Sequence, residues 1–470
     1  MKVDVAVKDG LVVLGQQARR AGIGIRNGRI SAIVDDSADL EARDEVIDAG
    51  GLVVFPGAID PHCHFWDPGF PERENWYTGT SSAAAGGITT VIEMPLSDPP
   101  TVDGASFRIK QERARAQAVT DFALWGGIVP ASLNGLDGRL AEMDRLGAVA
   151  YKAFMCWSAV EYPPVDDGVL IATLEALAAR GRMLALHAEN DAIIKYNEQL
   201  QHAAGKRDPQ AYLASRPEIA EYEAIGRALT LAAHTSTPLY IVHMTLAAGA
   251  ELIAAAKARG QRVWAETCPQ YLLLDTSALD RRGPYAKCSP PIRSRANVER
   301  LWPAVLGGTI DTIGSDHAPF PAAQKDPGYT DIWEAHNGLV GIETMVPLIL
   351  SEGVNRRGMS LPRAAALLST NAARVFDLYP RKGVIQVGAD ADLMLADLQH
   401  EWTVEGARFL SHNKWSPYDG MRLTGKIQRT IVRGRTVYAD AAIQVRPGYG
   451  EQVVPLRADV AATDTRAPRP

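Results

Sequence analysis

The middle of the chain alternates between short, continuous apolar runs and stretches with helical periodicity. Continuous apolar runs are typical of parallel strands that are buried on both faces. In the stretches between them, positions such as Leu170, Leu174 and Leu177 fall on one helix face. Eight strand-then-helix units predict an α/β fold, a (β/α)8 TIM barrel. The apolar runs span residues 52–59, 89–94, 122–128, 148–155, 183–187, 239–244, 262–267 and 312–316.

Both ends of the chain have a different pattern, with short strands separated by turns. Asn27-Gly28 lies between two apolar segments and is a strong signal for a two-residue hairpin. Residues 391–395 and 430–438 predict further short strands near the C-terminus. Two strand-rich ends around a different middle predict a small β-sandwich domain built from both termini. The predicted division is 1–53 and 383–450 for the β-sandwich, 54–382 for the barrel and 455–470 for a loose tail.

Composition and charge narrow the classes of function. With 46% hydrophobic and 22% charged residues, the chain has the composition of a globular protein. The formal net charge of −6 gives no electrostatic reason to expect nucleic acid or an anionic membrane as a partner. No apolar run is long enough for a membrane span, and no signal-peptide pattern opens the sequence. The cysteines form no C-x-x-C pair, so we expect a cytoplasmic protein without a disulfide framework; they are Cys63, Cys156, Cys268 and Cys288.

Histidines and one aspartate fall where predicted barrel strands end. His62 and His64 follow the first strand, and their spacing of two places both side chains on one face of an extended segment. His187, His243 and Asp316 end strands five, six and eight. Active sites of TIM barrels lie at the carboxyl ends of the strands. Imidazole and carboxylate groups that meet there predict a site for divalent metal ions.

Lys152 lies near the end of the fourth predicted strand. A lysine in an apolar strand can extend its ammonium to the rim or pair with a carboxylate. As an ammonium it would be repelled by metal ions. It suits a metal site only if carbon dioxide converts its amine into an anionic carbamate, whose two oxygens can bridge two metals.

The motifs around these residues carry a resemblance to a known family. They are similar to those of the cyclic amidohydrolase branch of the amidohydrolase superfamily, which comprises hydantoinases, dihydropyrimidinases, allantoinases and dihydroorotases. The resemblance runs from about residue 1 to about residue 450. The motifs are Pro56-Gly57 before Asp60-x-His62-x-His64, Gly86-Gly87-Ile88-Thr89-Thr90, Lys152, His187-Ala188-Glu189, His243, Cys288-Ser289-Pro290-Pro291-Ile292-Arg293, Ser315-Asp316-His317 and Gly388-Ala389-Asp390-Ala391-Asp392-Leu393.

The resemblance implies a binuclear metal centre. His62, His64 and Asp316 would bind the more buried ion, and His187 and His243 would bind the more exposed one. We expect two divalent ions, zinc first, with manganese or cobalt as alternatives, because histidine and carboxylate do not select sharply among them.

The resemblance also assigns roles around the metals. A carboxylated Lys152 would bridge the two ions, and Asp316 would take a proton from the attacking hydroxide and deliver it to the leaving ring nitrogen. Ser289 and Asn337 match two backbone-contact positions that grip the amide and ureide groups of the ring. Without the resemblance, both would be interpreted as turn residues.

The residues around the site bear on which of three ring substrates the protein accepts. A dihydroorotase would need an arginine and an asparagine for the substrate carboxylate, where this chain has Trp66 and Leu96. A hydantoin is favoured, which would make the protein a hydantoinase, and allantoin is the alternative, which would make it an allantoinase. Segments of both types occur, among them Asn337-Gly338-Leu339-Val340-Gly341-Ile342-Glu343 of the hydantoinase type.

The loop after the first strand is expected to shape the pocket for the ring substituent. An apolar wall would accept an aryl or alkyl group, whereas polar residues at 72–74 could recognise a ureido group or face solvent. Ordinary loop packing is the alternative for the apolar residues. The candidates for the wall are Trp66, Phe70, Trp76 and Trp157.

Two alternative functions from other classes of protein fit the sequence less well. A non-catalytic, dihydropyrimidinase-like scaffold protein would have lost metal ligands, but every ligand position here is filled. A mononuclear deaminase would lack Lys152. The resemblance further implies a homo-oligomer, a tetramer or a dimer, that acts on a small cyclic amide or ureide.

Overall fold

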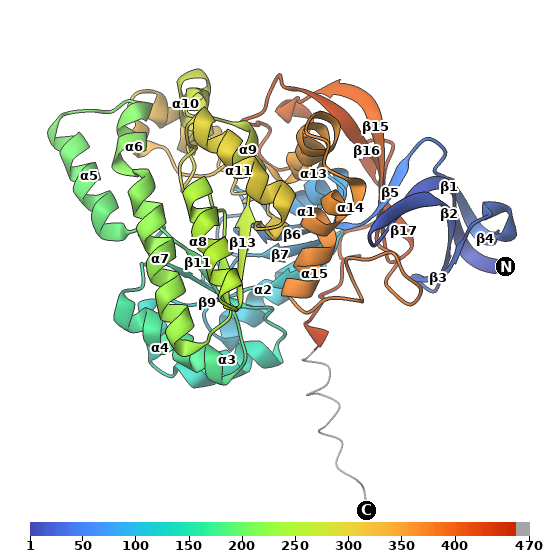
Figure 1. Cartoon of the computed structure of the whole chain (residues 1–470), viewed down its shortest axis with the longest axis horizontal. Helices are drawn as coiled ribbons and strands as arrows, with labels where there is room; N and C mark the ends of the chain where they lie inside the picture. Colours follow the sequence, from blue (N-terminus) through green and yellow to red (C-terminus); the bar gives the residue numbers. More distant parts are fainter. Residues whose placement is uncertain (161, 457–470) are drawn as a thin grey trace, which may run out of the picture.

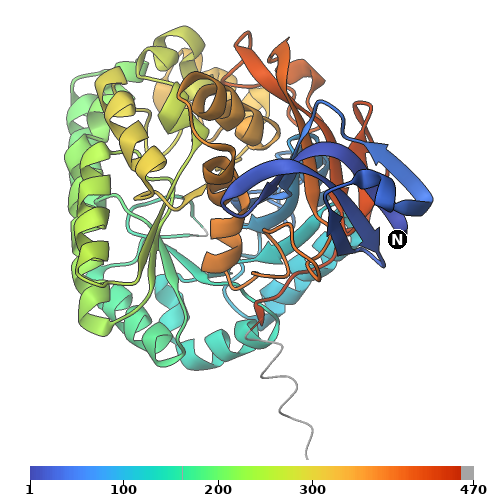
Figure 2. The same ribbon diagram turned by 45° about the vertical axis from the view of Figure 1, so that its right-hand side comes forward.

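The computed structural model describes residues 1–160 and 162–456. Eight strand positions form a closed parallel barrel, one of them interrupted at Trp125, between β8 and β9. Helices surround the barrel on the outside (Figures 1 and 2). The predicted TIM barrel is confirmed. Its strands are β6 (Ala58–Cys63), β7 (Ile88–Glu93), β8 (Asp121–Leu124), β9 (Gly126–Gly127), β10 (Tyr151–Phe154), β11 (Leu184–His187), β12 (Leu239–Ile241), β13 (Val263–Thr267) and β14 (Thr312–Ile313).

The helices follow from local sequence signals. In α4, Leu170, Leu174 and Leu177 are buried, as their periodicity predicts. Side chains cap several helix starts; Asp103 accepts from the amide of Ser106 at the start of α2. The main helices are α1 (Trp76–Ala85), α2 (Gly104–Gln117), α3 (Leu136–Arg145), α4 (Asp167–Ala179), α5 (Asp191–Ala203), α6 (Pro209–Ser215), α7 (Glu218–Thr235), α8 (Ala247–Ala258), α9 (Pro269–Leu273), α10 (Ser277–Arg282), α11 (Arg295–Gly307), α12 (Ala322–Lys325), α13 (Met345–Ile349), α14 (Leu361–Ala365) and α15 (Asn371–Val375).

Strands from both ends of the chain form one nine-stranded sheet beside the barrel (Figure 1). Asn27 and Gly28 have φ angles of 51° and 74°, as the predicted hairpin requires. The small β domain built from both termini is therefore confirmed. Its strands are β1 (Lys2–Leu14), β2 (Gln17–Arg26), β3 (Arg29–Val34), β4 (Glu41–Asp48), β5 (Val53–Pro56), β15 (Leu393–Thr403), β16 (Arg422–Val432), β17 (Arg435–Ala439) and β18 (Ala442–Ile443).

The continuity of the apolar run at 52–59 predicts a single barrel strand. The structure instead divides the run between two strands. Its first part, β5, pairs with β1 and β15 of the terminal sheet, and the barrel strand β6 begins only at Ala58. Gly57 separates the two, and a Cβ atom there would lie 2.3 Å from the Thr89 side chain. Both halves are buried, so hydrophobicity alone does not reveal the break.

The chain returns to the barrel after β18. The amide of Phe122 donates to the carbonyl of Glu451, and the amide of the buried Val453 donates to the carbonyl of Phe122. Leu456, in the predicted tail, donates its amide to the Asp377 carbonyl. Residues 457–470 of that tail lie outside the described residues. Within the described ranges, no helix combines the length and apolarity needed to span a membrane.

A buried ionic cluster joins the barrel to the terminal sheet. Nζ of Lys382 lies 2.5 Å from Asp121 at the start of β8, and 2.6 Å and 3.0 Å from Asp392 and Asp390, which precede β15. Arg433 also pairs with Asp121. The three carboxylates are close enough to suggest a metal site. Three basic side chains already pair with them, namely Lys382, Arg433 and Arg381, which lies 2.9 Å from Asp390, so the cluster is a structural ion network.

We expect Lys382→Met to destabilise the protein. The substitution leaves buried carboxylates without their main cation, which costs about 3–5 kcal/mol in free energy of unfolding. Urea unfolding followed by tryptophan fluorescence measures the loss. The exposed Lys2, replaced by methionine, is the control and should change stability by less than about 0.5 kcal/mol. Equal stability of the two variants would contradict this role.

The stability deficit of Lys382→Met should depend on pH. Burial raises the pKa of Asp392, and the Lys382 ammonium opposes that increase, so removing the ammonium raises this pKa further. A carboxyl whose pKa is raised by folding stabilises the folded state below its unfolded pKa, and this contribution is lost as pH rises. The deficit relative to wild type should be larger at about pH 7 than at about pH 5. A deficit that is independent of pH would contradict the assignment.

Candidate metal centre

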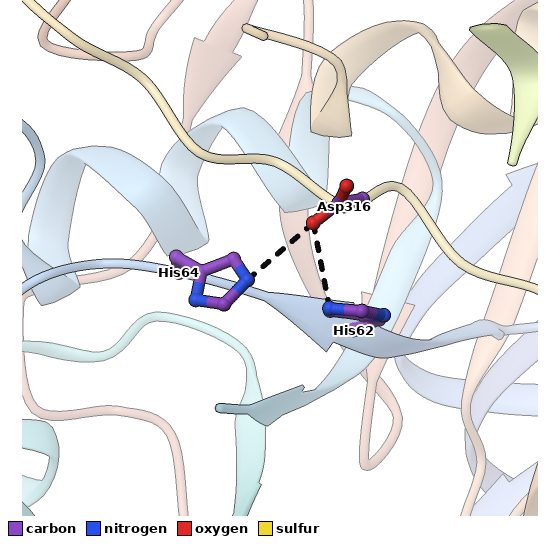
Figure 3. A group of neighbouring side chains, drawn as sticks. All are labelled: His62, His64 and Asp316. Carbon is purple, nitrogen blue, oxygen red and sulfur yellow. Dashed lines mark ion pairs between the residues drawn. The ribbon is translucent and has the colours of Figure 1, made fainter. Parts of the chain in front are cut away.

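Three of the predicted ligands meet where the first and last barrel strands join. Oδ1 of Asp316 lies 3.4 Å from Nε2 of His62 and 3.4 Å from Nε2 of His64. The three side chains point toward one another (Figure 3). Ligand atoms around a tetrahedral ion at about 2.0–2.1 Å are separated by about 3.4 Å, so this spacing suits an ion the size of zinc. The residues present therefore fit a divalent metal.

The backbone is left-handed at three residues of this region. The φ angles are 59° at Trp66, 38° at His243 and 46° at Asp316. Each residue comes two or three positions after its strand ends. Such a conformation is costly outside glycine and persists where the surrounding structure imposes it. It ends each strand in a sharp turn at the edge of the barrel where the candidate ligands lie.

The second pair of histidines lies beside the first group. The ring centroids of His187 and His243 are 4.5 Å apart, and those of His243 and His62 are 5.2 Å apart. Nε2 of His187 lies 2.7 Å from Glu189, which leaves its Nδ1 for another partner. Nδ1 of His243 is buried and forms no hydrogen bond within the described part of the chain. Four imidazoles therefore share one buried region.

Lys152 is the one buried charged group of this region that has no polar partner. Its Nζ forms no hydrogen bond or ion pair with any described residue and lies 4.8 Å from the ring centroid of Phe154. Burial lowers the pKa of Lys152 to about 7. A substantial fraction of its amine is therefore neutral at neutral pH.

Burial also sets the protonation states of the histidines. It lowers the pKa of His62 and His187, and it lowers the pKa of His64 and His243 well below the usual value. Neutral imidazole is the form that binds metal. Burial has the opposite effect on Asp316 and raises the pKa of its carboxyl.

The two predicted ring contacts lie on loops at the edge of the region. The Ser289 hydroxyl accepts from Arg216 at 2.8 Å and donates to Glu189 at 3.1 Å, so the hydroxyl is already engaged. The backbone of Ser289, and not its hydroxyl, is the part predicted to contact the ring. Oδ1 of Asn337 is buried and has no hydrogen-bond partner among the described residues.

The predicted aromatic wall is only partly formed by the expected residues. Trp66 is buried and stacks on His64, with ring centroids 5.4 Å apart. Trp76 is part of the barrel core, where it packs against Phe65 and Phe122. The prediction that Trp76 forms part of the wall is wrong, because α1 turns its side chain inward. Trp157 is 52% exposed and is not brought into the buried group.

Other apolar side chains complete the wall. Phe154 stacks on His187 with ring centroids 5.4 Å apart, and Phe320 packs against Trp66 at the same separation. Tyr162 and Leu96 belong to the same buried cluster. The candidate ligands thus have an aromatic surface beside them.

Comparisons with known proteins agree with this arrangement. A model of the amidohydrolase family matches residues 53–437. The chain belongs to the amidohydrolase family. It is 40% identical to an L-hydantoinase of Paenarthrobacter aurescens over 96% of this chain and 98% of that protein. It is 42% identical to an allantoinase of Rubrobacter xylanophilus, over 97% and 98% of the two chains.

Solved structures show the same likeness. An L-hydantoinase (dihydropyrimidinase) from Arthrobacter aurescens superposes with a TM-score of 0.93 at 40% identity, covering 96% of this chain and all of the other. A D-hydantoinase superposes with a TM-score of 0.90 at 34% identity, covering 96% and 99%. The predicted resemblance to cyclic amidohydrolases is confirmed.

Sequence reasoning missed one carboxylate of this amidohydrolase site. Glu266, on β13, accepts from Nδ1 of His62 at 2.7 Å and from the backbone amide of His243 at 3.0 Å. It also accepts from the Tyr240 hydroxyl at 2.8 Å. The glutamate fixes the His62 ring so that Nε2 faces Asp316. An acidic residue within the apolar run 262–267 was the available signal.

Glu189 plays a similar part for the second histidine pair. Burial alone would raise the pKa of Glu189, but Arg216 and His187 lower it to about 2. Arg216 lies 2.7 Å from the carboxylate. The motif His187-Ala188-Glu189 is evident in the sequence, but the sequence does not predict the role of its glutamate.

We expect Glu266→Gln to weaken zinc binding about 10- to 100-fold, because loss of the charge loosens the orientation of His62. Competition with a chromogenic chelator and metal analysis of the purified protein measure the change. Tyr240→Phe removes the hydrogen bonds of the Tyr240 hydroxyl with the other oxygen of Glu266 and with Thr312, and should have a smaller effect on zinc binding. Glu251, at the exposed end of a surface ion pair, gives the control variant Glu251→Gln. Wild-type zinc affinity in Glu266→Gln would contradict this role.

Proposed function

We propose that this amidohydrolase opens the C–N amide bond of a hydantoin-type ring with a binuclear metal centre. The observation that carries the proposal is the buried group of four histidines, Asp316 and an unpaired lysine at one end of the barrel. Relatives named hydantoinase and allantoinase at about 40% identity support it. We favour an enzyme over a non-catalytic scaffold, since every metal-ligand position is filled.

The residues divide into two sets of ligands. His62, His64 and Asp316 would hold one ion, and His187 and His243 the other. Two bound divalent ions supply a nucleophilic hydroxide at neutral pH and polarise the ring carbonyl. Zinc is proposed first, with manganese or cobalt as alternatives.

Lys152 is proposed to bridge the two sets as a carbamate. The ammonium first loses a proton to give the neutral amine, and the amine then adds to carbon dioxide with loss of a second proton. The repelled cation thereby becomes an anion. The support is geometric: Nζ is buried beside the histidines and has no other polar partner in the described chain.

Asp316 is proposed as the proton carrier. Its side chain is 11% exposed, more than those of His62 and His64, so it is the most exposed of the three side chains. It would take the proton of the attacking hydroxide and pass it to the ring nitrogen as the C–N bond breaks. The backbone at Ser289 and Asn337 would orient the ring.

The wall of the pocket favours a hydantoin with an apolar substituent over allantoin. Trp66, Phe154 and Phe320 offer aromatic surface beside the histidines, whereas a ureido group needs polar partners. Glu74, one candidate for ureido recognition, is buried and accepts from His317 and Ser411. It is therefore engaged within the protein. Allantoin stays the second candidate because an allantoinase is 42% identical.

We further propose a cytoplasmic homo-oligomer, a tetramer or a dimer, acting on a small cyclic ureide. All four cysteines are free and buried, which suits a reducing compartment. Sedimentation of the purified protein tests the oligomeric state.

A turnover panel tests the substrate. Zinc-replete enzyme should open a 5-aryl hydantoin fastest, because its aryl group gains from the aromatic wall. Hydantoin itself should come next, and allantoin, dihydrouracil and dihydroorotate should be opened more slowly. Loss of ring absorbance and product analysis measure the rates. Opening of allantoin alone would overturn the hydantoinase assignment, and no opening of any ring would overturn the class of substrate.

We expect Lys152→Ala to lose bound metal and nearly all activity, and Asp316→Asn to keep the fold with most of the rate lost. Metal analysis, circular dichroism and ring opening are measured for both. Lys257→Ala, which removes a lysine paired with Asp311 away from the site, is the control. A Lys152→Ala enzyme that holds two metals and turns over normally would refute the bridge, and an active Asp316→Asn enzyme would refute the proton carrier.

A further inference from the structure

Two lysines near the predicted ring contacts are buried without an acidic partner. Lys287 immediately precedes the Cys288-Ser289 motif, and Lys325 ends α12. Both side chains are buried, and neither forms an ion pair with any residue in 1–160 or 162–456. Burial lowers the pKa of each lysine to about 7. An ammonium in this environment depends on hydrogen-bond acceptors close by.

The acceptors of Lys325 lie on both sides of Asn337. Nζ of Lys325 donates to the carbonyl of His336 at 2.9 Å and to the carbonyl of Gly338 at 3.0 Å. It also lies 3.4 Å from the carbonyl of Lys287. One ammonium therefore contacts the carbonyl groups of both residues that flank Asn337 and the segment that leads to Ser289.

Lys287 completes the same arrangement from the other side. Its Nζ donates to the carbonyls of Ile332 at 2.7 Å and Ala335 at 2.5 Å. Its own carbonyl accepts from the amide of Gly338 at 3.0 Å. The two lysines thus tie residues 332–338 to residues 287–289 by charge-assisted hydrogen bonds, which are stronger than neutral ones.

Aromatic faces cover both ammonium groups. Nζ of Lys287 lies 4.9 Å from the ring centroid of Tyr212, and Nζ of Lys325 lies 5.6 Å from that of Trp415. Tyr212 also donates its hydroxyl to the carbonyl of Cys288 at 2.7 Å. The Tyr212 ring therefore belongs to the same packing unit, and cation–π attraction at both rings compensates part of the cost of burying the charges.

We propose that Lys325 and Lys287 are positioning residues that hold the backbone at Asn337 and Ser289 at a fixed separation for gripping the ring. The inference rests on the proposed function, because that function makes these two positions the ring contacts. Neither lysine is in the metal-ligand set. Their loss should therefore affect how the ring is bound, with the metals retained.

The test compares Lys325→Met, Lys287→Met and the double variant with wild type. Methionine keeps much of the apolar length and removes the donors. If the backbone contacts act equally in the bound ring and the transition state, KM for the ring substrate should rise roughly 10- to 100-fold while kcat falls less than about threefold. Metal content should stay at the wild-type value.

Two further readouts separate positioning from general loss of structure. Since both lysines act on one pair of segments, the double variant should raise KM by less than the product of the single effects. Hydrogen–deuterium exchange should accelerate in peptides covering 284–290 and 332–340 and stay unchanged in those covering β6 and β11. Lys257→Met is the matched control, because Lys257 also donates to a backbone carbonyl but lies beside Asp311.

The outcomes are distinguishable. Failure of wild type to open any ring would overturn the proposed function, and with it the ring-gripping role, even where exchange accelerates as expected. Wild-type ring opening with an unchanged KM in folded Lys325→Met and Lys287→Met would overturn the positioning role alone. Loss of metal in both variants, or multiplicative KM effects in the double variant, would also overturn it. If Lys325→Met does not fold, Lys287→Met carries the KM and exchange measurements.

Discussion

The site depends on two backbone hydrogen bonds that close the barrel between its first and last strand positions. The amide of His64 donates to the carbonyl of His317 at 2.7 Å, and the amide of Asp316 donates to the carbonyl of His62 at 2.9 Å. Residues about 250 positions apart in the sequence thereby become neighbours. Asp60 adds to this seam by accepting from the amide and hydroxyl of Ser315. Without closure, His62, His64 and Asp316 would have no common point to face.

Burial of charge is the second constraint on the region. A buried carboxylate needs donors, and Glu266 and Glu189 obtain them from the histidine rings that they orient. The same requirement makes Lys152 stand out, since its amine has no such partner in the described chain. His62 and His187, which have carboxylate partners, are fixed in orientation, whereas the buried amine of Lys152 is the group for which a chemical modification is proposed.

The sequence predicts the strand-borne half of the site well. A single histidine at the end of an apolar run is usually an ordinary structural residue, but several on different strands are hard to explain in that way. The pattern therefore indicates His62, His187 and His243 as a set. Glu266 was missed because it lies inside its run, where one acidic residue does not reveal which ring it contacts. The division of 52–59 was missed because β5 and β6 are equally buried.

The loop-borne half could not be predicted from periodicity. Trp66 and Trp76 occur in one loop segment, yet one stacks on His64 and the other enters the core. Lys287 and Lys325 are 38 residues apart and donate to carbonyl groups of the same segment, residues 332–338, only because two loops pack together. Long-range loop packing leaves no local pattern in the sequence, and here it decides which residues surround the ring.

The separation of ligands at strand ends from contacts on loops bears on how one fold can serve related reactions. Candidate ligands at strand ends are held by the barrel, whereas the proposed ring contacts and most of the aromatic wall lie on loops, which can change without disturbing the barrel. Phe154, at the end of β10, is the exception. Relatives with 36–42% identity carry the names of both hydantoinase and allantoinase. In the proposed mechanism, the strand-borne groups hydrolyse the ring amide, while a few side chains around them select the ring substituent. In this chain those side chains are mainly aromatic, and the polar Glu74 is already engaged by His317 and Ser411.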